Sequence, residues 1–398
     1  MPRRLPLPEF TAMLAMLYAT VAFSIDAMLP GLPVIAAELT PDAVNRAQLV
    51  ITSFVLGMGL GSGFAGPISD AIGRRATIIG GAGLYVIGTL LAYVAPSLEL
   101  LLAARVLQGL GAAAPRIVGL AVIRDLYQGR EMARVSSFVM LVFMVVPAIA
   151  PSIGQVIIWA AGWRSIFLAY VLFACVATGW LMLRQDETLP LAARRPLSLP
   201  VLLRGAKEVL GDRTVMICTA ALTVGFGQMM ALLSSIQQIY EETYHQGADF
   251  PKWFALSAVI AASASFVNAR LVMRLGMHRL ARGAFAVMAL FSTLVALVLA
   301  SNLLHGAAAF AAFYLWATSV FFMAGLVFGN LNAIAMQKMG HIAGMTASVM
   351  SAVSTVFGAS IAVPVGLAFN GTPLPAITGA VICSSLGWIA MGLLREEG

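Results

Sequence analysis

Long apolar runs alternate with short polar connections along the whole chain of 398 residues. A helix that crosses a bilayer needs about 20 mostly apolar residues, and each run is long enough for this. Strands of a membrane barrel would instead alternate apolar and polar positions over segments of about 10 residues. The pattern predicts an all-α membrane protein with twelve transmembrane helices, at approximately 9–30, 46–68, 76–95, 99–123, 132–158, 164–183, 213–240, 251–273, 280–301, 306–336, 343–369 and 374–394.

The longest polar connection, residues 184–212, separates the first six predicted spans from the last six. Secondary transporters are usually built from such repeated halves, with the substrate site near the bilayer midplane where the halves meet. We therefore predict two pseudo-symmetric six-helix bundles, residues 1–183 and 213–398, with 184–212 as a cytoplasmic linker between them.

The composition excludes several classes of protein. Hydrophobic residues make up 60% of the chain and charged residues 10%, whereas soluble chains carry about 25% charged residues. Such a chain cannot cover a water-facing surface, so a soluble enzyme is excluded, and its high hydrophobicity excludes disorder. The sequence contains no Walker lysine motif and no His or Cys pair with metal-ligand spacing. We expect no enzyme activity, no metal and no cofactor.

The 24 Lys and Arg residues are unevenly distributed over the connections. If the N-terminus is cytoplasmic, nineteen of them fall on the cytoplasmic side, where basic residues beside spans accumulate. We therefore predict that both termini are cytoplasmic. Because these residues are spread over many short loops, the net charge of +7 indicates orientation in the bilayer and no nucleic-acid partner.

The loop after the second predicted span carries a signature. Residues 66–75 read G-P-I-S-D-A-I-G-R-R, which resembles the G-x-L-x-D-x-x-G-R-K/R loop of the major facilitator superfamily. The matching positions are Gly66, Asp70, Gly73, Arg74 and Arg75. The resemblance implies a latch that stabilises the outward-open state. The alternative is an ordinary basic turn.

Two further segments resemble motifs of the same superfamily. Residues 105–114, R-V-L-Q-G-L-G-A-A-A, resemble its R-x-x-Q-G-x-G-A-A motif, which implies a role for Arg105 in proton coupling. The alternative is an arginine that only holds helices together. Residues 150–155, A-P-S-I-G-Q, resemble the antiporter motif G-P-x-x-G-G and imply export, with Pro147, Pro151 and Gly154 as its members. A proline kink alone is the other interpretation.

The end of the first predicted span indicates which family within the superfamily the chain resembles. Residues 24–33, S-I-D-A-M-L-P-G-L-P, are typical of the bicyclomycin- and chloramphenicol-resistance exporters of that superfamily. This implies a twelve-span drug:proton antiporter in the bacterial inner membrane, a monomer that works by alternating access on small-molecule substrates and protons. The alternatives are a dedicated exporter of one anionic or zwitterionic metabolite and, from another class, a non-transporting membrane receptor or sensor.

Asp26 and Arg105 are predicted to lie at the same depth. Rising about 1.5 Å per residue from the cytoplasmic side, the first helix places Asp26 about 22 Å into a hydrocarbon layer of about 30 Å. Arg105 lies about 9 Å below the outer start of the fourth helix, which runs the other way. The resemblance to the superfamily implies that these two helices are neighbours around the central cavity, so we predict that Asp26 alternates between a carboxylate paired with Arg105 and a neutral acid. The alternative is a permanent ion pair that orders two helices.

Arg116 is predicted to share a helix face with Arg105, because 11 residues bring the helix about 20° past three full turns. It either lines the substrate cavity, where it would favour anionic or strongly dipolar compounds, or reaches towards the cytoplasmic interface or a backbone carbonyl. Other residues of spans that line the pathway in the superfamily could contact substrate or join helices. These candidates are Tyr18, Phe23, Gln228, Met229, Gln237, Asn330 and Asn332.

Overall fold

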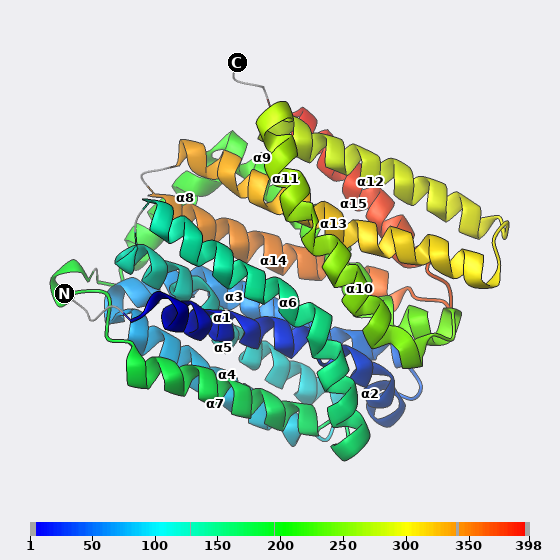
Figure 1. Cartoon of the computed structure of the whole chain (residues 1–398), viewed down its shortest axis with the longest axis horizontal. Helices are drawn as coiled ribbons and strands as arrows, with labels where there is room; N and C mark the ends of the chain where they lie inside the picture. The colour runs from blue at the N-terminus through cyan, green and yellow to red at the C-terminus, as the bar shows by residue number, and fades with distance from the viewer. Residues whose placement is uncertain (1–4, 128, 195, 340–341, 395–398) are drawn as a thin grey trace. The chain divides into compact units, whose positions relative to one another are not determined.

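The computed structural model describes residues 5–127, 129–194, 196–339 and 342–394, and all regular secondary structure in these ranges is helical (Figure 1). The chain ends, residues 1–4 and 395–398, lie outside the described residues. Eleven helical segments within the described ranges are long and apolar enough to cross a membrane. The apolar stretch Val145–Ala161 of α6 is shorter than these.

The helices of the first half follow the predicted spans closely, with one interruption. They are α1 Leu7–Asp26, α2 Leu32–Leu39, α3 Leu49–Ile72, α4 Arg74–Tyr93, α5 Leu98–Leu126, α6 Gly129–Ala161 and α7 Ser165–Arg184. The predicted single helix 9–30 is wrong in its last turn, because α1 ends at Asp26 and a 3₁₀ turn, Leu29–Gly31, leads into α2. Pro30 explains this end: its ring clashes with the carbonyl four residues earlier, which belongs to Asp26.

The second half begins after the short helix α8, Leu199–Gly211. Its helices are α9 Arg213–Gln238, α10 Phe250–Ala262, α11 Ala264–Leu275, α12 Met277–Ala300, α13 Gly306–Lys338, α14 Ala343–Leu367 and α15 Leu374–Gly392. The start of α9 is capped by Asp212, whose Oδ1 accepts the backbone N–H of Val215 at 2.9 Å. A turn of π-helix, Ile239–Thr243, extends α9.

The chain divides into two compact units. The first contains Met1–Thr40 and Ser53–Arg204, and the second contains Pro41–Thr52 and Gly205–Gly398. The short segment Pro41–Thr52 belongs to the second unit because its side chains bond there: Asn45 Nδ2 donates to the Phe369 carbonyl at 2.7 Å and Gln48 Nε2 to Gln238 Oε1 at 2.6 Å. The sequence did not indicate this exchange.

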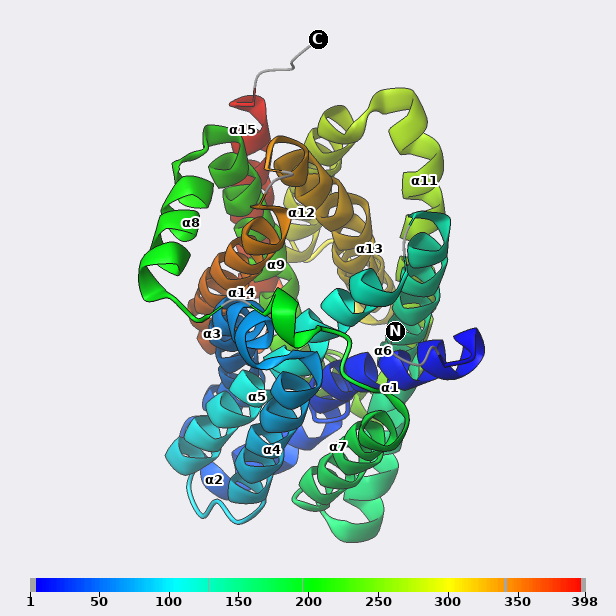
Figure 2. The same ribbon diagram turned by 90° about the vertical axis from the view of Figure 1, so that its left-hand side faces the viewer.

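The same helix pairings occur inside each unit. In the first unit α1 packs on α5, α6 and α7, and α4 packs on α5 and α7 (Figures 1 and 2). In the second unit α9 packs on α13, α14 and α15, and α12 packs on α13 and α15. Each pairing of the first unit therefore has its counterpart six spans later in the predicted order, which is the internal repetition typical of secondary transporters.

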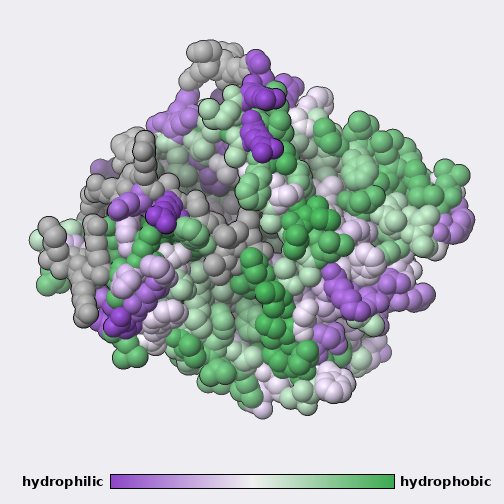
Figure 3. Space-filling view, viewed as in Figure 1, coloured by the Kyte–Doolittle hydropathy of each residue, from purple (hydrophilic) through white to green (hydrophobic). Residues whose placement is uncertain are grey.

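Large apolar side chains cover outward faces of the helices. On α12, Val287, Leu290, Leu294 and Leu297 are each more than half exposed and recur every three or four residues, so they form one stripe. Figure 3 shows this hydrophobic surface over α12. A stripe of this kind suits contact with lipid acyl chains, whereas a water-soluble surface would carry charge there.

Candidate functional site

Arg105 lies fully buried in α5 and is held by polar groups of its own unit. Its Nη1 donates to Gln108 Oε1 at 2.6 Å, and its Nη2 donates to the Ser24 carbonyl at 3.0 Å. The guanidinium carbon lies 4.6 Å from the centre of the Phe54 ring. A buried arginine in a spanning helix is costly unless such groups face it. Here dipoles and an aromatic ring contact the guanidinium.

Ser24 connects four helices around Arg105. Its carbonyl also accepts a hydrogen bond from the Tyr170 hydroxyl of α7 at 3.3 Å, and its hydroxyl shares a hydrogen bond with the Tyr85 hydroxyl of α4. The polar layer is therefore made of Ser24, Tyr85, Arg105, Gln108 and Tyr170. Only Arg105 was singled out from the sequence, because no spacing along the chain connects residues on α1, α4, α5 and α7.

The described partners of Arg105 include Gln108, Ser24 and Phe54, and no described hydrogen bond or ion pair joins its side chain to that of Asp26. The predicted contact is therefore absent from this conformation. The physical reason is helix geometry. Two residues correspond to a rotation of about 200° around α1, so Ser24 and Asp26 lie on nearly opposite faces of the helix. Ser24 faces Arg105, and Asp26 faces elsewhere while remaining buried, with 5% of its surface exposed.

The antiporter-like motif packs directly beside Asp26. A Cβ atom on Gly154 of α6 would collide with the backbone carbonyl of Ala27, the residue after Asp26. Pro147 and Pro151 both lie inside α6, and Pro151 is buried. Glycine at position 154 therefore allows α6 to approach the end of α1 at backbone distance.

The signature loop forms an ion-pair network. Gly73 has a φ of 105°, a conformation that favours glycine, and ends the turn between α3 and α4. Arg74 pairs with Asp70 and, through Nε, with Asp125 Oδ2 at 3.0 Å. Thr188 Oγ1 donates to the same Asp125 oxygen at 2.9 Å. The structure thus brings the loop, the end of α5 and the segment after α7 together within the first unit.

Glu187, which lies in a distant part of the sequence, caps the start of α4. Its carboxylate accepts the backbone N–H groups of Arg74 at 2.9 Å and Arg75 at 3.1 Å, and that of Leu189 at 3.0 Å. The first N–H groups of a helix have no partner within the helix, and a negative charge is favourable at that end. This cap was not predicted, because position 187 is more than 100 residues from the helix that it caps.

Arg116 lies between α1 and α3 and remains partly exposed. Its one hydrogen-bond contact among the described residues is a long one, from Nη1 to the thioether of Met58 at 3.9 Å. Tyr18 is close: its ring packs where a Cβ atom on Gly119, one turn further along α5, would sit. Tyr18 itself is 5% exposed.

Several other candidates serve to join helices. Gln228 accepts a hydrogen bond from Ser384 of α15 at 2.6 Å. Asn330 donates to Asn268 of α11 at 2.8 Å, and Asn332 donates to a carbonyl of its own helix at 2.8 Å. These amide contacts correspond to helix–helix and intrahelical hydrogen bonds, as expected for polar groups in spans.

The remaining candidates differ in their surroundings. Phe23 packs edge-on against Tyr170, with ring centres 5.3 Å apart, and so joins α1 to α7. Met229 is half-buried. Gln237 is buried, and its Oε1 accepts no hydrogen bond among the described residues, so its side chain retains a free acceptor.

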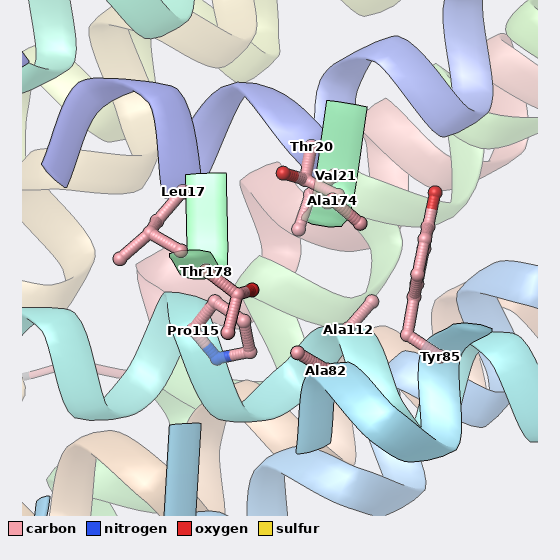
Figure 4. A pocket seen from close by; sticks show the side chains of 9 residues that line it. All are labelled: Leu17, Thr20, Val21, Ala82, Tyr85, Ala112, Pro115, Ala174 and Thr178. Atoms are coloured by element: carbon pink, nitrogen blue, oxygen red, sulfur yellow. The ribbon is translucent and has the colours of Figure 1, made fainter. Parts of the chain in front are cut away.

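A small cavity of about 10 Å³ lies inside the first unit. Figure 4 shows its lining by side chains from four helices, namely Leu17, Thr20, Val21, Ala82, Tyr85, Ala112, Pro115, Ala174 and Thr178. This volume suits about one water molecule and is too small for a substrate. Tyr85 belongs to both this cavity and the polar layer, so the layer borders a gap in the packing.

Groups of three or more His, Cys, Asp or Glu side chains that could hold a metal ion are absent from the described ranges. Away from the signature loop, the chemistry available inside α1 and α5 is that of the buried Asp26 carboxyl group and of the Arg105 and Arg116 guanidinium groups. Such a set can bind and release a proton or hold an anion.

Comparison with known proteins gives a consistent result. A sequence model of the Major Facilitator Superfamily matches residues 14–364. The MFS-type transporter YdgK of Bacillus subtilis is 30% identical over 97% of this chain and 95% of its own length. A bicyclomycin resistance protein homolog of Haemophilus influenzae is 29% identical over 88% of this chain and 87% of its own. The crystal structure of a D-xylose-proton symporter has a similar fold, with a TM-score of 0.74 at 14% identity, covering 95% of this chain and 97% of the symporter.

Proposed function

Since the chain belongs to the Major Facilitator Superfamily and is a multi-pass membrane transporter, not an enzyme, we propose that it exports small molecules in exchange for protons. The resistance named for the Haemophilus influenzae relative and the S-I-D-A-M-L-P-G-L-P segment support drugs as substrates. In this proposal the chain is a monomer in the bacterial inner membrane. It has twelve spans and cytoplasmic termini, and its two halves alternate access to the substrate.

The observation that carries the proposal is the buried carboxyl group of Asp26, two residues after Ser24, whose carbonyl accepts a hydrogen bond from the guanidinium of Arg105. A charged carboxylate in a spanning helix needs a counter-charge, and no described residue forms an ion pair with Asp26. In this proposal Asp26 is therefore the group that carries the proton in this conformation. Release of that proton inward leaves a carboxylate that is attracted to Arg105, and this attraction favours a different conformation of the end of α1.

The contact between Gly154 and Ala27 connects this change to α6. A rotation of the end of α1 that turns Asp26 towards Arg105 must also move the Ala27 backbone against Gly154. Because glycine has no side chain that could change its conformation there, the backbone of α6 must move as well. The signature loop has a separate role in the proposal: Arg74, Asp70 and Asp125 form the network that holds one of the alternating states.

The test of the proposed coupling uses purified protein in liposomes with an imposed pH gradient, with radiolabelled bicyclomycin and chloramphenicol as probes. Asp26→Asn keeps the shape of the side chain but cannot exchange a proton. We expect it to lose accumulation against the drug gradient and to retain exchange down that gradient. Asp42→Asn, at an exposed acid between α2 and α3, is the matched control and should behave as wild type.

Two results would contradict the proposal. Accumulation by Asp26→Asn equal to that of wild type would exclude Asp26 as the coupling group. If wild-type protein moved neither drug in response to a pH gradient, drug:proton antiport of these compounds would be excluded, although the chain would remain a transporter of the superfamily.

A further inference from the structure

Two arginines of α5 share a helix face but have different surroundings. Arg105 is fully buried and donates to an amide oxygen and a backbone carbonyl at 2.6 and 3.0 Å. Arg116 is partly exposed and reaches only the Met58 sulfur at 3.9 Å. A thioether is a weak acceptor, whereas a guanidinium has five N–H donors. Most donors of Arg116 are thus left without an acceptor from the described protein.

Arg116 also forms no ion pair with an acid among the described residues. The two acids of α1, Glu9 and Asp26, are nine and eight residues from Tyr18 along that helix, which corresponds to about 12–14 Å. The ion pairs of the described arginines are formed elsewhere, as between Arg74 and Asp125 at 3.0 Å and between Arg184 and Glu9 at 2.6 Å. A guanidinium held inside a spanning bundle without a resident anion is costly, and an anion from outside the protein would remove that cost.

The side chains around Arg116 suit an aromatic or apolar anion. Met58 provides a polarisable, adaptable surface on α3, and the Tyr18 ring lies on α1 against Gly119. The planar fork of an arginine matches a carboxylate or sulfonate with two parallel hydrogen bonds. Apolar contact and one fixed charge together are the usual composition of a small-molecule site.

We propose that Arg116, with Tyr18 and Met58, forms the anion-binding part of the substrate site, so that organic carboxylates and sulfonates are the substrate class. This inference rests on the proposed export function and names the class of compounds that the protein exports. It also favours the metabolite-exporter alternative over carriage of cationic drugs, because a bound cation would meet the charge of Arg116.

The test measures equilibrium binding to the purified full-length protein without any gradient. The probes are matched pairs: naphthalene-2-carboxylate with naphthalene-2-carboxamide, and naphthalene-2-sulfonate with naphthalene-2-sulfonamide. We expect wild type to prefer each anion, and Arg116→Gln to bind the anions about tenfold more weakly or worse while binding the amides as wild type does. Arg116→Lys should recover part of the loss, and Arg204→Gln, at an exposed arginine of α8, should show none.

Three results would overturn the inference: equal binding of anion and amide by wild type, equal anion binding by wild type and Arg116→Gln, or a loss of amide binding as large as the loss of anion binding. A lipid headgroup is the other source of an anion. Stabilisation that depends on Arg116 in nanodiscs containing phosphatidylglycerol but is not produced by the naphthalene anions would make Arg116 a lipid contact and would also overturn it. Because no gradient is used, the binding test is independent of proton coupling. The anion site can be contradicted while coupling through Asp26 is confirmed, and coupling can be contradicted while the anion site is confirmed.

Discussion

At the scale of single residues, Glu187 joins three parts of the first unit. It caps α4, bonds the turn that follows α7 through Leu189, and lies 4.0 Å from the guanidinium of Arg194. Because α4 begins within the signature loop, the carboxylate of Glu187 also positions Arg74 for its contacts with Asp70 and Asp125. One acid from the connection between the halves thus supports the network proposed to hold one state.

Replacement of Glu187 by alanine should destabilise the protein. The variant leaves the first N–H groups of α4 without an acceptor and removes a favourable charge from the helix start. We expect Glu187→Ala to lower the free energy of unfolding by about 1–2 kcal/mol. The measurement is an unfolding titration of the purified protein in mixed micelles.

Asp186→Ala is the matched control, because Asp186 is exposed and precedes Glu187 directly. Its free energy of unfolding should stay within about 0.5 kcal/mol of wild type, as is usual for exposed positions. If the two variants were equally stable, the cap would contribute nothing to stability. The proposal that Glu187 of the linker supports the signature loop would then be contradicted.

At the scale of helices, glycines set how closely α5 and α6 approach their neighbours. A Cβ atom on Gly109 would collide with the Phe54 carbonyl of α3, and one on Gly154 with the Ala27 carbonyl at the end of α1. Gly109 belongs to the arginine motif and Gly154 to the antiporter-like motif. In both places the motif's small residue serves close packing of helices beside an ionisable group.

Gly154→Ala should therefore affect both stability and coupling. The added methyl group meets backbone that cannot rotate away, so α6 must shift from the end of α1; we expect a loss of about 1–3 kcal/mol. We also expect reduced pH-driven drug accumulation, because the shift occurs next to Asp26. Gly179→Ala in α7 is the control, since nothing lies within 4 Å of its added Cβ atom.

The control variant is expected to be as stable as wild type or more stable by about 0.4–1 kcal/mol, because alanine reduces the freedom of the unfolded chain. Full accumulation by Gly154→Ala, together with unchanged stability, would show that the close approach of α6 to α1 is not required. The proposed connection between Asp26 and α6 would then be discarded.

At the scale of the whole molecule, the proposed arrangement of twelve spans predicts on which side each connection lies. The linker around Ala193 should be cytoplasmic and the connection around Leu303 should be outside, because an odd number of proposed spans separates them. Leu303 is 73% exposed, so a cysteine placed there can react.

Labelling with a membrane-impermeant maleimide tests this arrangement in a variant whose Cys175, Cys218 and Cys383 are replaced by alanine. Leu303→Cys should react in intact cells, and Ala193→Cys only after the membrane is permeabilised. Val287→Cys, on the apolar stripe of α12, should stay unreactive in both conditions. Reaction of positions 193 and 303 from the same side would contradict twelve spans.

The sequence by itself determined the spanning helices and the family. A helix in lipid must satisfy its own backbone hydrogen bonds, so length and apolar character along one segment are enough to identify it. The loop from Gly66 to Arg75 could likewise be identified from adjacent residues alone. Even the equal depth predicted for Asp26 and Arg105 follows from the rise of single helices.

Only the tertiary structure decided which groups meet. Arg105 bonds Ser24 and not Asp26 because the rotation of α1 about its axis is set by packing against α5, α6 and α7. Glu187 caps α4 for the same reason: its partner lies more than 100 residues away. Hydrophobic runs specify which segments are helical, but the side chains that interlock between helices determine which face each helix turns towards its neighbours.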